Sequence, residues 1–113
     1  VEDYGVPAYD ELVIVANKAE VNAPKIKKFL DALQQGVSYL RAHSQQTWQR
    51  FAKAHPELNT ELNQQAWLQN VPLFATDPAA LDKPRYDAYE QFLYNNKLVK
   101  KVTPLANYAI ELR

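Results

Sequence analysis

The chain has 113 residues, of which 47% are apolar and 23% charged, an ordinary globular composition that argues against disorder. Its acidic and basic residues cancel to a net charge of zero, which argues against a strongly basic nucleic-acid binder. Cysteine is absent, which excludes disulfides, thiolate metal sites and a cysteine nucleophile. The longest uncharged apolar run, Leu12–Ala16, is too short to cross a bilayer. Because the chain starts at Val1 and has no methionine, we expect a processed chain or a piece of a longer one.

The first 17 residues predict a loop followed by a short strand. Gly5 and Pro7 mark residues 1–10 as a loop. The segment Glu11–Asn17 then carries four consecutive apolar residues, three of them β-branched, which is typical of a strand covered on both faces. A single strand cannot satisfy its own backbone groups, and the chain offers hardly any partner elsewhere. We therefore expect a neighbour outside this sequence.

A long amphipathic helix is predicted from Asn22, a candidate N-cap, to about His43, with Pro24 in its first turn. Its apolar residues recur at helical steps: Ile26, Phe29, Leu30, Leu33, Val37 and Leu40. Gly36 interrupts the helix at a cost of about 1 kcal/mol relative to alanine. We interpret this glycine as a place of close packing.

Three more helices are predicted by caps and breakers. Ser44 is expected to cap a helix through about Ala54, and Asn59 or Thr60 to start one that Pro72 ends. Asp82 is expected to cap a fourth, which stops at residues 95–96. Its apolar stripe is Tyr86, Tyr89, Phe92 and Leu93. In the tail, an alternation predicts a second short extended segment: Tyr108, Ile110 and Leu112.

The predicted fold class is therefore mainly α with one or two short strands. We expect residues 1–113 to form a single domain that is part of a larger protein. Within it, residues 1–17 form a loop and strand, residues 22–96 about four helices, and residues 97–113 a tail.

Most candidate functional residues have a structural explanation. His43 and His55 lie at expected helix ends, where a cap is the ordinary role, and no His-x-x-x-His metal spacing occurs. The chain lacks a Gly-x-Ser-x-Gly turn and a glycine-rich phosphate loop. Trp48 and Trp67 fit a core better than a stacking platform. Three lysines fit a solvated helix end: Lys97, Lys100 and Lys101.

The loop that leads into the predicted strand carries Tyr4, Tyr9, Asp10 and Glu11. Such loops often present ligand groups from a rigid scaffold. A tyrosine can stack on a flat ring, and a carboxylate can accept hydrogen bonds from an exocyclic amine or a ring N–H. On chemistry alone, a polar surface turn is the reading we favour.

Four segments together resemble one family: GVPAYDELVIVANK, APKIKKFLDALQQGVSYLRAH, WQRFAKAHPELNTELNQQAW and ALDKPRYDAYEQFLYNNKLVKKVTPLANYAIEL. The chain resembles the C-terminal part of periplasmic solute-binding proteins of ABC importers for hydroxymethylpyrimidine-type thiamine precursors. These proteins are related to the eukaryotic thiamine-pyrimidine synthases. The resemblance covers essentially the whole chain, and GVPAYDEL and PELNTELN are its distinctive motifs.

The resemblance implies a C-terminal helical portion of a two-lobed α/β fold that is about three times as long, with a ligand cleft between the lobes. It implies an aminopyrimidine ligand contacted by Tyr9 and Glu11, with Asp10 behind them, and no cofactor, metal or catalytic residue. It implies ABC-importer membrane subunits as partners, no nucleic acid, and a periplasmic or extracellular location. The resemblance also implies that this chain alone binds the pyrimidine weakly or not at all.

Two alternatives stay open. The first is a thiamine-pyrimidine synthase, although the synthases carry a cysteine-rich motif where this chain has VPAYDE, which favours binding over synthesis. The second is a freestanding helical domain without ligand, whose unpaired strand forms a homodimer with a second copy.

Overall fold

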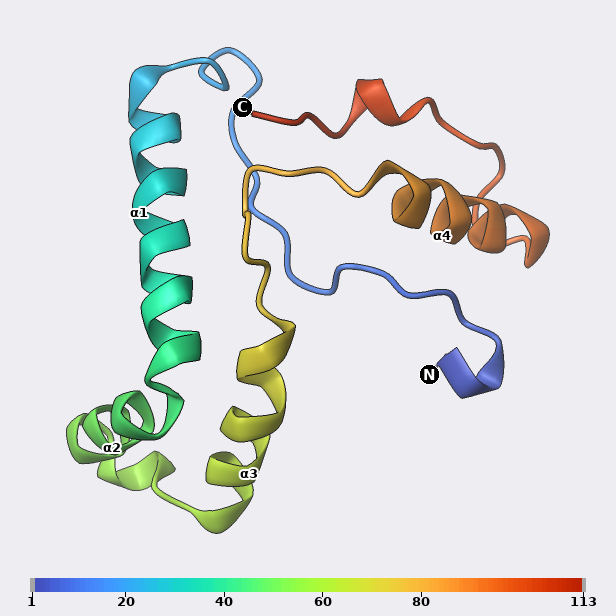
Figure 1. The fold of residues 1–113 in the computed structure, drawn as a ribbon. Coiled ribbons are helices and arrows are strands. Elements are labelled where there is room, and N and C mark those ends of the chain that lie inside the picture. The colour runs from blue at the N-terminus through green and yellow to red at the C-terminus, as the bar shows by residue number, and fades with distance from the viewer. Residues whose placement is uncertain (1, 113) are drawn as a thin grey trace. The chain divides into compact units, whose positions relative to one another are not determined.

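The computed structural model describes residues 2–112, and within them it contains helices and no strand (Figure 1). The α-helices are α1 (Pro24–Ala42), α2 (Ser44–Ala54), α3 (Glu61–Asn70) and α4 (Lys83–Asn95). Short 3-10 turns lie between and around them: η1 (Glu2–Tyr4), η2 (Pro56–Leu58), η3 (Val71–Leu73) and η4 (Leu105–Asn107). The predicted mainly helical class is confirmed. None of the described helices has an apolar stretch long enough to cross a membrane.

Contacts within the chain divide it into two compact units. Unit 1 consists of Val1–Asn22 and Ala79–Arg113, and unit 2 is Ala23–Pro78. Unit 1 therefore combines segments from both ends of the chain, whereas unit 2 is continuous. That the chain is one domain of a larger two-lobed protein stays a prediction.

Unit 2 holds the buried core of the described residues. Five apolar side chains are less than a tenth exposed: Leu30, Val37, Trp48, Ala52 and Val71. The ring of Trp67 packs against Trp48 and Phe51, with centroids 5.7 and 5.5 Å apart, and its indole N–H donates to the carbonyl of Ser44 at 3.0 Å. Trp48 is thus a core residue, as predicted, while Trp67 is half-buried and packs against it, and the two rings join α2 to α3.

Two of the predicted helix caps are confirmed. The Thr60 hydroxyl accepts the backbone N–H of Asn63 at 3.2 Å and begins α3. The Asp82 carboxylate accepts the backbone N–H of Arg85, also at 3.2 Å, and begins α4. In each case a side-chain oxygen satisfies a first-turn amide that has no partner inside the helix.

Two other predicted caps are wrong. The N-cap of α1 is Ala23 rather than Asn22, and the N-cap of α2 is His43 rather than Ser44; neither helix has a side-chain cap bond. At α1, Pro24 takes the first position, where proline has no N–H to satisfy and its fixed φ suits the helix. At α2, a single residue separates it from α1, so Ser44 already lies inside the new helix.

The predicted close packing at Gly36 is also wrong. A Cβ atom built on this residue meets no heavy atom within 4 Å, other than those of its own helix backbone and chain neighbours. The glycine lies on the exposed side of α1. Its conformational freedom is therefore a cost to the helix with no packing gain to offset it.

The strand expected within Glu11–Asn17 is not formed, because no described segment pairs with it and a lone strand leaves its backbone groups without partners. The side chains of Leu12 and Val15 are 89% and 86% exposed. The expected extended segment near Tyr108 is absent too, since the tail forms η4 and then irregular backbone.

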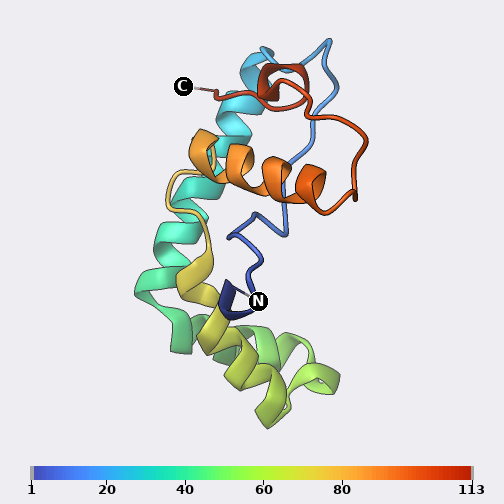
Figure 2. The same ribbon diagram turned by 90° about the vertical axis from the view of Figure 1, so that its right-hand side faces the viewer.

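Unit 1 is built around α4. After α4 ends, the chain turns back along the helix, as Figures 1 and 2 show. Lys97 takes a positive φ of 58° at this turn. The backbone N–H of Lys97 donates to the carbonyl of Tyr94, and that of Leu98 donates to the carbonyl of Leu93. These two hydrogen bonds close the end of the helix. No described residue of unit 1 is buried, so this unit has no core of its own.

Candidate functional site

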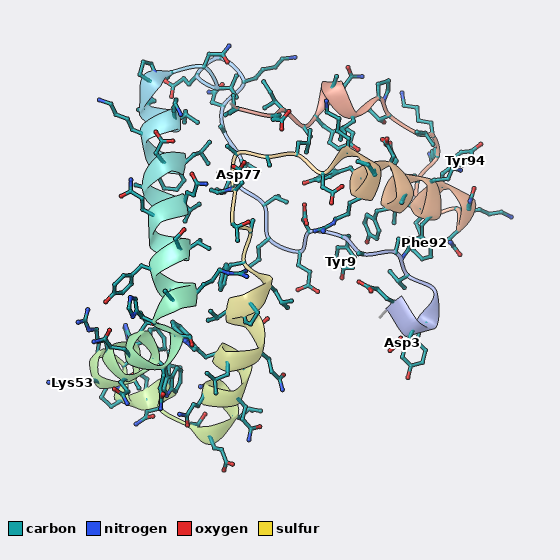
Figure 3. The ribbon with its side chains drawn as sticks, viewed as in Figure 1. Asp3, Tyr9, Lys53, Asp77, Phe92 and Tyr94 are labelled. Carbon is teal, nitrogen blue, oxygen red and sulfur yellow. The ribbon has the colours of Figure 1, made fainter. Side chains whose placement is uncertain are left out.

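The predicted ligand-binding residues, Tyr9, Asp10 and Glu11, lie on the irregular segment between η1 and α1. This segment belongs to unit 1, as does α4, and side chains join the two. Figure 3 shows Tyr9 on the same side of α4 as Phe92. The three residues differ in what they contact, and these contacts separate their roles.

Tyr9 is half-buried and stacks on Tyr89 of α4. The ring centroids are 4.6 Å apart and the ring planes are inclined by 15°. Tyr89 in turn stacks on Phe92, with a centroid distance of 6.1 Å. The aromatic stripe predicted for the fourth helix therefore supports Tyr9 from one side, and a flat ligand can stack only on the opposite face.

Asp10 is committed to a structural ion pair. Its Oδ1 atom accepts a hydrogen bond from Nη1 of Arg85 at 2.7 Å, and this bond raises the pKa of the guanidinium. Burial, followed by the negative charge of Asp10, raises the pKa of the Tyr86 hydroxyl. Through its bond with Arg85, Asp10 links the loop to α4.

Glu11 is exposed and has acceptor capacity left. Its Oε1 atom accepts a long hydrogen bond from the Tyr9 hydroxyl, at 3.4 Å. The negative charge of Glu11, followed by burial, raises the pKa of Tyr9, so the phenol stays protonated at neutral pH. An ionised carboxylate accepts about four hydrogen bonds. Glu11 can therefore receive N–H groups of a ligand that lies beside Tyr9.

The arrangement suits a flat ring that carries N–H donors, but it is one wall only. A hollow nearby, lined by residues 2 and 5–8, is open to solvent. Residues 2–112 contain no cluster of acidic or histidine side chains that could hold a metal ion. The chemistry that these residues offer is stacking and hydrogen-bond acceptance.

Sequence reasoning missed Arg85 and the specific partner role of Tyr89. Tyr89 was predicted to lie on an apolar stripe of the fourth helix, but that pattern did not indicate which residue it would contact. The signal for Arg85 is a lone arginine three residues after a capping aspartate, which gives no indication of a partner 75 positions away. Tyr4, part of the predicted cluster, is 89% exposed on η1 and does not take part in these contacts.

The other candidates lie at surface positions. His43 and His55 are C-cap residues of α1 and α2, as expected, and Nδ1 of His55 lies 3.4 Å from a carboxylate oxygen of Glu57. The lysines at positions 97, 100 and 101 are exposed, as expected for a solvated helix end.

Comparisons with known proteins now bear on this site. Residues 1–47 match the family model described as NMT1/THI5 like, and this range contains Tyr9, Asp10 and Glu11 but none of α4. A curated Haemophilus influenzae protein named "Putative thiamine biosynthesis protein" is 47% identical over 112 residues, which cover 98% of this chain. No solved structure matches the chain. The chain spans 36% of the length of that relative, and its similarity to a protein named for thiamine biosynthesis extends from the loop through α4.

Proposed function

We propose that this chain forms one wall of a binding site for an aminopyrimidine of the hydroxymethylpyrimidine type. The observation that carries the proposal is the Tyr9 ring, stacked on Tyr89 and half-buried, beside the exposed Glu11 carboxylate, within the range similar to NMT1/THI5-like proteins. The ring of the ligand would stack on Tyr9, while its exocyclic amine would donate to Glu11. The name of the Haemophilus influenzae relative supports a role connected with thiamine.

In the proposed mechanism, a larger protein captures the pyrimidine by closure of a cleft and passes it to the membrane subunits of an ABC importer. No covalent step is involved. Delivery of this kind implies a periplasmic or extracellular location. No described residue of unit 1 is buried, which supports the idea that its surfaces are completed by a further part of such a protein.

The test uses hydroxymethylpyrimidine and isothermal titration calorimetry. We expect weak or no binding to the 113-residue chain, since one open wall cannot bury a small ligand. We expect 1:1 binding to a chimera in which this chain replaces the aligned 112 residues of the Haemophilus influenzae relative. Tight stoichiometric binding to the isolated chain, or no binding to a folded chimera, would overturn the proposal.

Paired substitutions in the chimera test the named residues. Tyr9→Leu and Glu11→Gln should each weaken binding by about tenfold, corresponding to ~1.4 kcal/mol. Tyr4→Leu and Asp3→Asn likewise remove a tyrosine and a carboxylate, here from the exposed turn η1, and should leave affinity unchanged. Equal effects in both pairs would show that the loop is not the ligand wall.

A second candidate is synthesis of the pyrimidine, which the word "biosynthesis" in the name of the relative favours. The two candidates make opposite predictions in cells that cannot make hydroxymethylpyrimidine. A synthase would support growth without added pyrimidine, whereas a binding protein would only lower the concentration that growth requires. Mass spectrometry of the pyrimidine pool checks the result directly.

A further inference from the structure

The segment that carries Tyr9 and Glu11 has no secondary structure to hold it. Residues 6–17 form neither helix nor strand. Gly5, at the start of this segment, has a φ of 83°, a conformation that glycine adopts readily. The direction in which Tyr9 and Glu11 point therefore depends on side-chain contacts rather than on a backbone ladder.

Two contacts fasten this segment to α4. One is the stack of Tyr9 on Tyr89, and the other is the ion pair between Asp10 and Arg85. They involve neighbouring residues on the loop and residues one helical turn apart on α4. The ion pair thus lies immediately beside the stacked ring, where it can fix the position of that ring.

The side chain of Arg85 is also oriented by a contact at the N-terminal end of α4. Its Nε atom lies 3.3 Å from Oδ2 of Asp82, the residue that caps α4, while Nη1 reaches Asp10. A planar guanidinium can donate hydrogen bonds to two carboxylates at once, because its N–H groups point in fixed directions. A lysine has a single charged nitrogen and cannot reproduce this fork.

We infer that Arg85 is a positioning residue for the ligand wall: through Asp10 it holds Tyr9 against Tyr89 and so orients the opposite face of the Tyr9 ring and the Glu11 carboxylate. This inference rests on the proposed function for its ligand, but the arrangement of the loop stands on the contacts alone. Arg85 itself does not touch the ligand.

The first experiment needs no ligand and uses the 113-residue chain. Stacking on Tyr89 shifts the NMR signals of the Tyr9 ring protons, and Arg85→Gln should move these signals toward their values in an unstructured peptide. Lys83→Gln removes the same charge from the first turn of α4 and should leave them in place. Amide signals from the last two turns of α4 should be unchanged in both variants, which separates loop release from unfolding of the helix.

The second experiment measures hydroxymethylpyrimidine affinity in the chimera. Arg85→Gln and Asp10→Asn should each weaken binding by about fivefold, and the double variant should be no weaker than either single one, because both remove the same contact. Arg85→Lys should fall between the unsubstituted protein and Arg85→Gln. Additive losses would contradict positioning through Asp10.

The two proposals fail in different ways. If Arg85→Gln leaves the Tyr9 ring signals unchanged, the positioning role is wrong even where the chimera binds the pyrimidine. If the unsubstituted chimera binds nothing while the ring signals move as expected, the proposed ligand is wrong and Arg85 still positions the loop.

Discussion

The carboxylate of Glu90 accepts a hydrogen bond from the hydroxyl of Tyr108, with 3.2 Å between the two oxygens. Its other oxygen accepts the backbone N–H of Thr103. One half-buried side chain of α4 thus fastens the tail at two points, five residues apart. Because none of the residues described for unit 1 is buried, such polar contacts carry a larger share of its stability than they would around a core.

Replacing Glu90 by glutamine should therefore release the tail. An amide has a single acceptor oxygen and no charge, so it can accept only one of these two hydrogen bonds and holds it more weakly than a carboxylate does. We expect a loss of about 1–2 kcal/mol in the local opening free energy, seen as a ~5- to 30-fold drop in hydrogen-exchange protection of the Thr103 amide. Asp87→Asn, on the same helix but without a bond to the tail, serves as the control. Equal loss of protection in both variants would contradict a specific clamp.

Unit 1 should lose stability in alkali. Burial, followed by the Glu90 charge, raises the pKa of Tyr108 above 10.0, and burial with the Asp10 charge raises the pKa of Tyr86. Just above pH 10, the hydroxyls of Tyr86 and Tyr108 therefore keep their protons in the folded unit, whereas the same hydroxyls of the unfolded chain have released them. This stabilisation is complete below pH 10 and disappears as the pH rises through the folded pKa values.

The measurement is denaturant unfolding followed by circular dichroism at about pH 9 and about pH 11. The free energy of unfolding should be lower at the higher pH, and Tyr108→Phe should reduce the difference. Phenolate absorbance, recorded in folded and denatured protein, gives the titration itself. A pH-independent free energy over this range would contradict the prediction.

Gly36→Ala should stabilise unit 2 by about 1 kcal/mol, because a methyl group at this exposed helix position meets open space and removes backbone freedom from the unfolded chain. Ala32→Gly, at another exposed position of α1, should cost about the same amount. Urea unfolding followed by the fluorescence of Trp48 and Trp67 reports on this unit directly. A loss of stability in Gly36→Ala would mean that another part of the protein packs there.

The isolated chain should self-associate through residues 12–15. Four consecutive apolar side chains, each more than half exposed on a segment without secondary structure, favour pairing with a second copy. We expect sedimentation at micromolar concentration to show species heavier than 13.0 kDa. Replacing Val13 and Val15 by lysine should restore the monomer, while Leu62→Lys, on exposed α3, should not. A single 13.0 kDa species in the unsubstituted chain would contradict the prediction.

Local sequence predicted much of the secondary structure. The apolar spacing of the first helix placed α1, and the ends of α2, α3 and α4 follow from breakers and from the caps Thr60 and Asp82. The predicted strand failed for a specific reason. Glu11–Asn17 has the composition of a strand, but a strand exists only where a second backbone accepts its hydrogen bonds.

The sequence by itself determined the approximate bounds of the four helices and that Trp48 belongs to the core of unit 2, because caps, prolines and apolar periodicity act over a few neighbouring residues. It also identified Tyr9, Asp10 and Glu11 as a candidate cluster. Only the tertiary structure separated their contacts, by bringing Arg85 and Tyr89 to a loop at the other end of the chain. The pairs Asp10–Arg85 and Tyr9–Tyr89 form only when the two ends of the chain come together in unit 1. No local pattern in either segment indicates its distant partner.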